Sequence, residues 1–430
     1  MEVPEGWEHL FEPNTVLRLK KTVYGARQSA KRFWISVLKA MDEMEFQRSK
    51  MDPCVYYKWN ENGLCIIMSY VDDMYIVGAT AAVMDAKAKF LSHFSCDDVG
   101  EANEYISNKV TKENGTMKLT QPVLLQSFKD EFPLPKERPM TPATAGTVLQ
   151  LGDSHLDSQE QAKYRSTVGK LIHIMKWSRP DCLNAVRELS RFMTKAGPAQ
   201  LKAAYRVMNY CLATPNRGKY MNPKRHCSDL KTFKFCIHGT SDSDFAKDPV
   251  RRRSVSGRVT YIEGCPITIK SNMQNITALS SCEAELYSAT ECAQDLMYIY
   301  RLMTEIGLQV QLPMILYVDN QGAIDLVNNW SSGGRTRHIE CKQYYLRELK
   351  EEEPPIVVLK YKHTKLNEAD TLTKNLVRRE FEVHNAHFVG QDEYMMDSST
   401  EDEDEKPNAV PNSESTAEER LKQSKTVHWS

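Results

Sequence analysis

Four acidic residues carry the chemistry that this sequence predicts: Asp242, Glu285, Asp319 and Asp370. They lie in four separate stretches of the second half of the chain. Like charges repel when they are brought together, so a shared site would need a bound cation. Mg²⁺ prefers carboxylate and water oxygens, and two such ions about 4 Å apart can stabilise the attacking and leaving oxygens of phosphodiester cleavage. The alternative is that each acid separately occupies a turn or the surface.

Two of these acids are expected at the ends of strands. Residues 233–238 are short, apolar and aromatic, which predicts a strand that brings Asp242 near its end. Residues 314–318 form a continuous apolar run, as in a strand that is buried on both faces. Asp319 follows directly, at the carboxyl end where open α/β sheets place ligands. The two aspartates are therefore expected at the same edge of one sheet.

A third acid is expected on a long helix. Residues 281–306 contain no Pro and precede Gly307, which predicts a helix with Ser280 or Ser281 as its N-cap. Residues two apart on a helix face different ways, so only one of Glu283 and Glu285 can face a shared site. The sequence leaves a similar choice between Asp242 and Asp244, whose side chains share one face of a strand.

Together these stretches resemble the ribonuclease H domain of Ty1/copia-type retrotransposon Pol polyproteins. The matching segments are Ser241–Asp244, Arg251–Arg253 with Ser254–Gly257, Ala278–Glu285, Tyr317–Ile324, Arg335–Ile339 and Asn367–Lys374. The resemblance implies that Asp242, Glu285, Asp319 and Asp370 bind two Mg²⁺ or Mn²⁺ ions. It also implies that His363, seven residues before Asp370, assists the hydrolytic step. The implied partners are an RNA–DNA hybrid and template RNA.

A second chemical signal lies near the amino terminus. Asp72 and Asp73 are flanked by the apolar runs Ile66–Tyr70 and Met74–Val77, which predicts a hairpin with two carboxylates at its tip. The alternative is an ordinary solvated turn. Apolar flanks favour the first interpretation, because they would bury the hairpin and hold the acids together.

Upstream of this hairpin, cationic and aromatic residues alternate between Leu19 and Trp34. Lys20, Lys21, Arg27 and Arg32 are the candidate contacts to nucleic acid, since such a pattern suits a phosphate backbone and stacked bases. An amphipathic basic helix explains the same composition equally well.

Both segments resemble the palm of copia-type reverse transcriptases. Tyr70–Asp73 matches the metal-binding hairpin, Tyr24 and Gln28 match the segment near the incoming nucleotide and template, and Met51–Tyr56 matches the link between them. In that family a further metal-binding Asp lies upstream of the segment that matches Pro4–Glu8. We therefore expect DNA polymerase activity to be absent from this chain alone.

The chain is expected to be an α+β and α/β multidomain protein. The predicted parts are a partial polymerase palm (1–120), a helical thumb or connection (121–232), a ribonuclease H-like α/β domain (233–376) and a largely disordered acidic tail (377–430). The central part is expected to contain a helix at 121–132 that opens with Pro122, and helices near 159–177, 180–194 and 198–213.

Composition limits the class of protein. The 430 residues are 41% hydrophobic and 26% charged, as in a globular chain. The net charge of −1 is unevenly distributed, since residues 391–430 carry −7 and the rest +6. The 11 scattered cysteines, without a C-x-x-C pair, favour a reducing compartment. No apolar run is long enough to span a membrane.

The leading functional hypothesis is a retrotransposon reverse transcriptase and ribonuclease H fragment that hydrolyses the RNA strand of RNA–DNA hybrids. The alternative is a non-catalytic nucleic-acid-binding relic of a retroelement. A cytoplasmic retroelement particle or the nucleus is the expected location, and the acidic start of the chain is unlike a signal peptide. The sequence does not define an oligomeric state.

Overall fold

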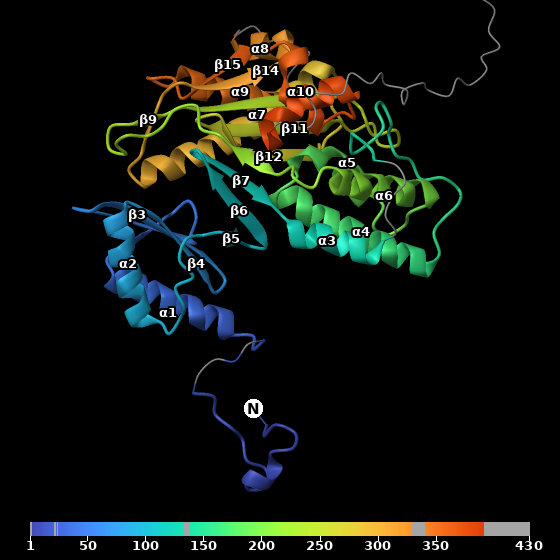
Figure 1. Ribbon diagram of the computed structural model, residues 1–430. Coiled ribbons are helices and arrows are strands. Elements are labelled where there is room, and N and C mark those ends of the chain that lie inside the picture. The colour runs from blue at the N-terminus through green and yellow to red at the C-terminus, as the bar shows by residue number, and fades with distance from the viewer. Residues whose placement is uncertain (1, 21–22, 24, 133–137, 329–339, 391–430) are drawn as a thin grey trace, which may run out of the picture. The chain divides into compact units, whose positions relative to one another are not determined.

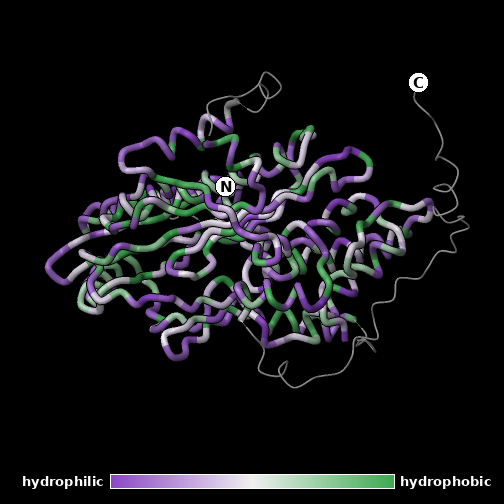
Figure 2. Tube along the Cα trace, turned by 90° about the horizontal axis from the view of Figure 1, so that it is seen from above, coloured by the Kyte–Doolittle hydropathy of each residue, from purple (hydrophilic) through white to green (hydrophobic). Residues whose placement is uncertain are grey.

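The computed structural model describes residues 2–20, 23, 25–132, 138–328 and 340–390 (Figure 1). Within these ranges the chain is a mixed α/β protein with several sheets and ten α-helices. Apolar stretches, green in Figure 2, run along strands and helices, whereas the projecting loops are mostly hydrophilic. No helix in the described part of the chain is both long and apolar enough to cross a membrane.

A four-stranded antiparallel sheet forms the amino-terminal part. Its strands, in spatial order, are β1 (Gln47–Arg48), β2 (Val55–Asn60), β3 (Gly63–Tyr70) and β4 (Asp73–Gly78), and it is preceded by the short 3₁₀ helix η1 (Glu8–Leu10). Helices α1 (Ser29–Glu43) and α2 (Thr80–His93) share a core with this sheet, in which Met41, Ile67 and Phe90 are buried. Alternating apolar residues along β3 supply the inward-facing side chains.

A helical part follows, with a small sheet beside it. Its helices are α3 (Pro122–Glu131), α4 (Ser158–Trp177), η2 (Pro180–Cys182), α5 (Leu183–Ser190) and α6 (Pro198–Ala213), and its strands are β5 (Glu104–Tyr105), β6 (Asn108–Glu113), β7 (Thr116–Thr120) and β8 (Lys219–Met221). Helix α3 begins at Pro122, as the sequence predicts, because the ring suits the first helical turn. Phe128, Leu171 and Tyr210 lie in the core of this part.

A five-stranded mixed sheet carries the candidate site. Its spatial order is β12 (Cys265–Met273), β11 (Val255–Ile262), β10 (Ile237–Asp244), β14 (Met314–Val318) and β15 (Val357–Tyr361). The first three strands are antiparallel, and β14 and β15 run parallel to β10. The sheet therefore combines an antiparallel hairpin section with parallel central strands. The carboxyl ends of β10 and β14 consequently lie at the same edge. The short strands β9 (Lys234–Phe235) and β13 (Gln309–Val310) pair beside the sheet.

Helices cover both faces of this sheet. Helix α7 (Ser281–Glu305) packs on β10 so closely that a Cβ added at Gly239 would lie 2.7 Å from Cys292 Sγ. The other helical elements are α8 (Gln321–Asn328), α9 (Glu340–Glu351), η4 (Thr364–Leu366), η5 (Glu368–Leu372) and α10 (Arg378–Val389). Segment η5 lies on the other side of β11, since a Cβ added at Gly257 would lie 2.9 Å from the Ala369 carbonyl oxygen. The sheet edge with the carboxylates is thus enclosed by elements from both faces.

Helix α7 also touches the amino-terminal sheet at its far end. The Glu305 carboxylate accepts hydrogen bonds from Ser49 Oγ (2.6 Å) and the Lys50 amide (2.7 Å). Trp59 Nε1 donates to the Ile306 carbonyl at 2.7 Å. Helix α7, which presents Glu285 near its start, is therefore hydrogen-bonded to the first sheet near its end.

Three expected boundaries differ from the structure. The predicted strand at 233–238 is instead β9 followed by β10, which continues to Asp244 because it stays paired with β11 along its length. The helix predicted to reach 194 ends at Ser190. The predicted disordered tail begins with a helix, α10, whose Phe381 and Phe388 are buried. Residues 391–430 of that tail lie outside the described residues.

Candidate active site

Three carboxylates from three elements meet at one edge of the mixed sheet. Asp242 comes from β10, Asp319 follows β14 and Asp370 belongs to η5. One carboxylate oxygen of each lies within 4.8 Å of the other two. Asp242 and Asp370 are buried and Asp319 is half-buried. The residues that the sequence predicts at the two strand ends are therefore brought together with the acid from the carboxyl-terminal segment.

The electrostatics of this group favour a bound cation. Burial and the adjacent Asp242 raise the pKa of Asp370 to about 8. Burial and Asp242 also raise the pKa of Asp319, although a hydrogen bond from Thr364 acts in the opposite direction. Mutual repulsion in a poorly solvated site disfavours the ionised carboxylates, and a divalent ion would relieve it.

Glu285 approaches the same group from α7. Its Oε1 accepts hydrogen bonds from the Ser243 amide (3.0 Å) and hydroxyl (2.8 Å). Its Oε2 is buried and has no hydrogen-bond partner among the described residues. Burial, followed by the charges of Asp242 and Asp319, raises the pKa of Glu285 well above its usual range. Glu285 is not one of the three acids whose oxygens lie within 4.8 Å of one another, but a buried oxygen without a partner, near enough to Asp242 and Asp319 to feel their charges, fits a hard divalent cation.

The neighbouring acid Glu283 has a different role. The Ser280 hydroxyl accepts from the Glu283 amide at 3.1 Å, and Glu283 Oε2 accepts from the Leu279 amide at 2.6 Å. These contacts satisfy amide groups at the start of α7 that have no helical partner. Glu283 therefore stabilises the helix N-terminus, and Ser280 is the N-cap.

Asp244 is likewise engaged outside the group. Its Oδ2 lies 3.1 Å from Lys247 Nζ, in an ion pair across the turn that follows β10. Asp242, two residues earlier, is the strand residue that joins Asp319 and Asp370. Of the two aspartates left open by the sequence, Asp242 has the geometry of a metal ligand.

Residues that the sequence analysis did not select hold the carboxylates in place. The Thr373 hydroxyl donates to Asp242 Oδ2, and the Thr364 hydroxyl donates to Asp319 Oδ2 at 2.9 Å. Lys374 Nζ lies 3.2 Å from Asp370 Oδ1 and 3.6 Å from Asp242 Oδ1. Lys374 follows Asp370 by four residues, but the pairing of Thr373 with Asp242 has no local signal, because the two are 131 residues apart in the chain.

His363 lies immediately before Thr364 and is exposed. Its Nδ1 accepts a hydrogen bond from the Lys365 amide at 3.2 Å and so caps η4. With Nδ1 used in this way, the neutral ring carries its proton on Nε2.

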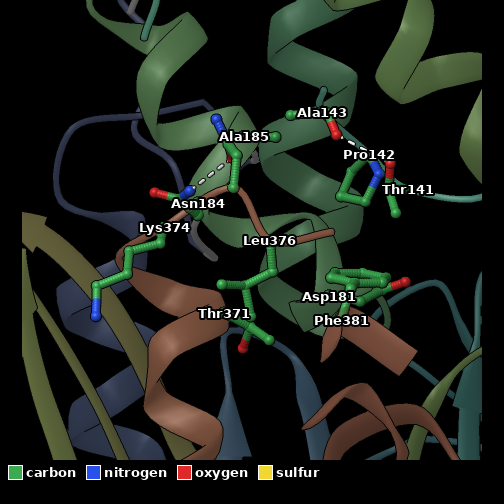
Figure 3. Close-up of a pocket in the computed structure, with 11 residues that line it drawn as sticks. Thr141, Pro142, Ala143, Asp181, Asn184, Ala185, Thr371, Lys374, Leu376 and Phe381 are labelled. Carbon is green, nitrogen blue, oxygen red and sulfur yellow. Dashed lines mark hydrogen bonds between the residues drawn. The ribbon is translucent and has the colours of Figure 1, made fainter. Parts of the chain in front are cut away.

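The segment after Asp370 is anchored to the helical part. Asn375 Oδ1 accepts from Asn184 Nδ2 at 2.8 Å, and Asn375 Nδ2 donates to the Thr147 carbonyl at 2.8 Å. This segment borders a small cavity, and in Figure 3 the Lys374 side chain extends away from Leu376 and Phe381. The backbone is thus fixed on one side while Lys374 reaches the carboxylates on the other.

Gly257 permits this segment to lie against β11. It pairs with Asp242 in the β10–β11 ladder, and an added Cβ would lie 2.7 Å from Thr373 Cγ2. Real Cβ atoms do not approach so closely. A side chain at position 257 would therefore push Thr373 and Asp370 away from the sheet.

The amino-terminal hairpin presents the second pair of acids. Tyr70 pairs with Asp73, and Val71 has a φ of 58°, which is strained for a β-branched residue. Asp72 and Asp73 are exposed, so the flanking apolar residues do not bury the tip as expected. Among the described residues, no third acid joins them in a metal-binding group.

The other candidates of this region lie on the surface or outside the described residues. Lys20, Arg27, Gln28 and Arg32 are exposed, and Gln28 directly precedes α1. Lys21 and Tyr24 lie outside the described residues, as does the motif Arg335–Ile339.

Comparison with known proteins defines the class. The family profile described as reverse transcriptase (RNA-dependent DNA polymerase) matches residues 1–145. The retrovirus-related Pol polyprotein from transposon TNT 1-94 of Nicotiana tabacum is 30% identical over 89% of this chain and 29% of its own length. The corresponding polyprotein from transposon RE1 of Arabidopsis thaliana is 27% identical over 89% of this chain and 25% of its own length.

Over most of its length the chain is similar to the Pol polyproteins of Ty1/copia-type retrotransposons. It spans between a quarter and three tenths of the length of these two relatives. A solved structure, that of the LC11 ribonuclease H1 isolated from compost, is similar at 15% identity and a TM-score of 0.26, over 32% of this chain and 92% of that one.

Proposed function

We propose that this chain is a metal-dependent ribonuclease that cuts the RNA strand of an RNA–DNA hybrid. The observation that carries the proposal is the meeting of Asp242, Asp319 and Asp370 with oxygens within 4.8 Å, beside the partnerless oxygen of Glu285. All four donors are carboxylates, the ligand type of Mg²⁺ and Mn²⁺. Similarity to Pol polyproteins supports a nucleic acid as substrate.

In this proposal Asp242, Glu285, Asp319 and Asp370 hold two divalent ions. When bound, such ions supply an activated water and charge stabilisation at the phosphate. Thr373 and Thr364 orient the carboxylates of Asp242 and Asp319 by hydrogen bonding. His363 assists proton transfer or product release through Nε2. Selection of RNA rests on contacts to 2′-hydroxyl groups in the wide minor groove.

A basic turn at the same sheet edge supplies contacts to the phosphate backbone. Arg251 and Arg252 are exposed in the turn between β10 and β11. Asp248 fixes this turn, since its Oδ1 accepts from the amides of Val250 (2.9 Å) and Arg251 (3.1 Å). Exposed guanidinium groups on a rigid turn suit phosphates, which position a nucleic acid without reading its sequence.

The test is cleavage of a labelled RNA–DNA hybrid with Mg²⁺ by the wild-type protein and by Asp319→Asn. Loss of at least about 100-fold in the variant supports the nuclease, because the remaining acids cannot hold both ions. The rival interpretation, a non-catalytic nucleic-acid-binding relic, predicts that both proteins bind the hybrid and neither cleaves it.

We also propose that this chain does not polymerise DNA by itself. Asp72 and Asp73 form an exposed pair, and no third acid joins them within the described ranges. Two-ion polymerisation needs enough carboxylates to hold both metals. Templated incorporation of dNTPs in a primer-extension assay on the purified chain would contradict this proposal.

A further inference from the structure

We infer that Lys247 is a positioning residue for Asp242 and that helix α5, outside the mixed sheet, supports it. The inference rests on the proposed nuclease function and goes beyond it. It assigns a role to a buried lysine that is neither a metal ligand nor a contact to the carboxylate group of Asp242 itself. It also makes the helical part a component of the nuclease site.

The surroundings of Lys247 are unusual for a lysine. Its side chain is only 7% exposed, and a buried ammonium group needs partners for its charge and three donors. Nζ donates to the Thr373 carbonyl oxygen, lies 3.1 Å from Asp244 Oδ2 and lies 3.6 Å from Glu188 Oε1. These partners come from the segment after η5, from β10 and from α5. One side chain thus contacts three elements that are distant from one another in the sequence.

Thr373 transmits this anchoring to the carboxylate group. Lys247 holds the Thr373 carbonyl, and the hydroxyl of the same residue donates to Asp242 Oδ2. The hydrogen bond selects one orientation of the Asp242 carboxylate. Asp242 Oδ2 is thus fixed by the Thr373 hydroxyl, while Oδ1 lies 3.6 Å from Lys374 Nζ. Replacing a residue that orients a metal ligand by hydrogen bonding typically lowers metal affinity or activity about 10- to 100-fold.

Helix α5 holds the same segment at two further points. Glu188, whose side chain is 3% exposed, lies 3.4 Å from Asn375 Nδ2 through its other oxygen. Arg187 Nε donates to Ser271 Oγ at 3.0 Å, and Ser271 Oγ donates to the Leu372 carbonyl. The backbone from Leu372 to Asn375 is therefore clamped between α5 and the sheet.

A purely structural role for Lys247 makes a different prediction. A buried ion pair that only stabilises the fold would lower the melting temperature when it is removed, without changing metal affinity at temperatures where the protein is folded. The chain offers a matched control in Lys219 on β8, whose buried amine donates to the Ile267 carbonyl at 3.0 Å. This hydrogen bond joins β8 to β12 and involves no site carboxylate.

The experiment compares Lys247→Met, Lys247→Arg and Lys219→Met in the full chain. Binding of Mn²⁺ is followed by electron paramagnetic resonance, and kcat and KM are measured on a labelled hybrid. We expect Lys247→Met to weaken Mn²⁺ binding about tenfold and to lower kcat about 10- to 100-fold with little change in KM. Lys247→Arg should retain most of the Mn²⁺ affinity and most of kcat, and Lys219→Met should leave Mn²⁺ affinity unchanged.

Thr373→Val removes only the hydroxyl and tests the same chain of contacts if Lys247→Met does not fold. It is expected to lose Mn²⁺ affinity to a similar extent. Wild-type Mn²⁺ affinity in folded Lys247→Met or Thr373→Val overturns the positioning role and leaves the proposed nuclease intact. A wild-type protein that binds Mn²⁺ no better than Asp370→Asn, and cleaves no hybrid, overturns the proposed function and the inference together.

Discussion

Replacing Asp370 with Asn is expected to stabilise the metal-free protein while weakening its response to Mg²⁺. Burial and Asp242 raise the pKa of Asp370 from 3.8 to about 8. In the folded state the carboxyl is therefore mostly protonated at pH 7, whereas in the unfolded chain it is ionised. One pKa unit corresponds to about 1.4 kcal/mol, so this single group costs the folded state up to about 4 kcal/mol at pH 7.

Asn has nearly the same shape and does not titrate, so the variant avoids this cost. Loss of the contact to Lys374, 3.2 Å from Asp370 Oδ1, offsets part of the gain. We expect the free energy of unfolding in EDTA to rise by about 1–3 kcal/mol at pH 7. The sign follows from proton binding. A carboxyl with a raised pKa keeps its full contribution to stability below about pH 4 and loses it as the pH rises through about 8.

The assay is urea unfolding followed by circular dichroism between pH 5 and 9, with EDTA or Mg²⁺. The wild type should lose stability toward pH 9 in EDTA and regain it with Mg²⁺, since a ligand of the folded state stabilises it. Asp370→Asn should show a flatter pH profile and a weaker response to Mg²⁺. Asp325→Asn, which alters an exposed acid on α8, is the matched control. A less stable Asp370→Asn in EDTA at pH 8–9 would refute the reasoning.

Three further predictions follow from the site. Gly257→Ala should cost about 1–3 kcal/mol of stability and most of the nuclease activity, because the added methyl displaces Thr373; urea unfolding and hybrid cleavage check this. Glu283→Gln should lower the free energy of unfolding by at most about 1 kcal/mol and leave Mg²⁺-dependent cleavage intact. Glu285→Gln should abolish cleavage. Loss of cleavage in Glu283→Gln but not in Glu285→Gln would reverse the roles assigned to the two residues. The double substitution of Arg251 and Arg252 by Ser should weaken hybrid binding. It should also reduce the slope of log K against log [salt] by about 1–2 in magnitude, as measured by fluorescence anisotropy at several salt concentrations.

Regular elements of the site were predictable because their signals are local. The apolar run 314–318 corresponds to β14 without change, and the predicted helix 281–306 is found as Ser281–Glu305. Asp319 could be placed from the strand that precedes it. Ser280 could be anticipated as a cap, since hydroxyl groups satisfy free amides at helix starts.

The partners of the acids could not be predicted from local pattern. Lys247 contacts Glu188 and Thr373, which are far from it in the chain and close only after the sheet and helices have packed. The choice of Asp242 over Asp244 depends on this lysine, because the ion pair engages Asp244. Similarly, nothing in residues 378–389 distinguishes them from the polar tail except burial of Phe381 and Phe388 against other elements.

The 25-residue helix α7 has a mechanical consequence for the protein. At 1.5 Å per residue it is a strut about 37 Å long. Its first turns present Glu285. Its last turn carries Glu305, whose carboxylate accepts hydrogen bonds from Ser49 and Lys50. A helix that is hydrogen-bonded near both ends holds those ends at a constant separation. Ser49 and Lys50 are therefore held at a set distance from Glu285, and the first sheet and the candidate site share one rigid element.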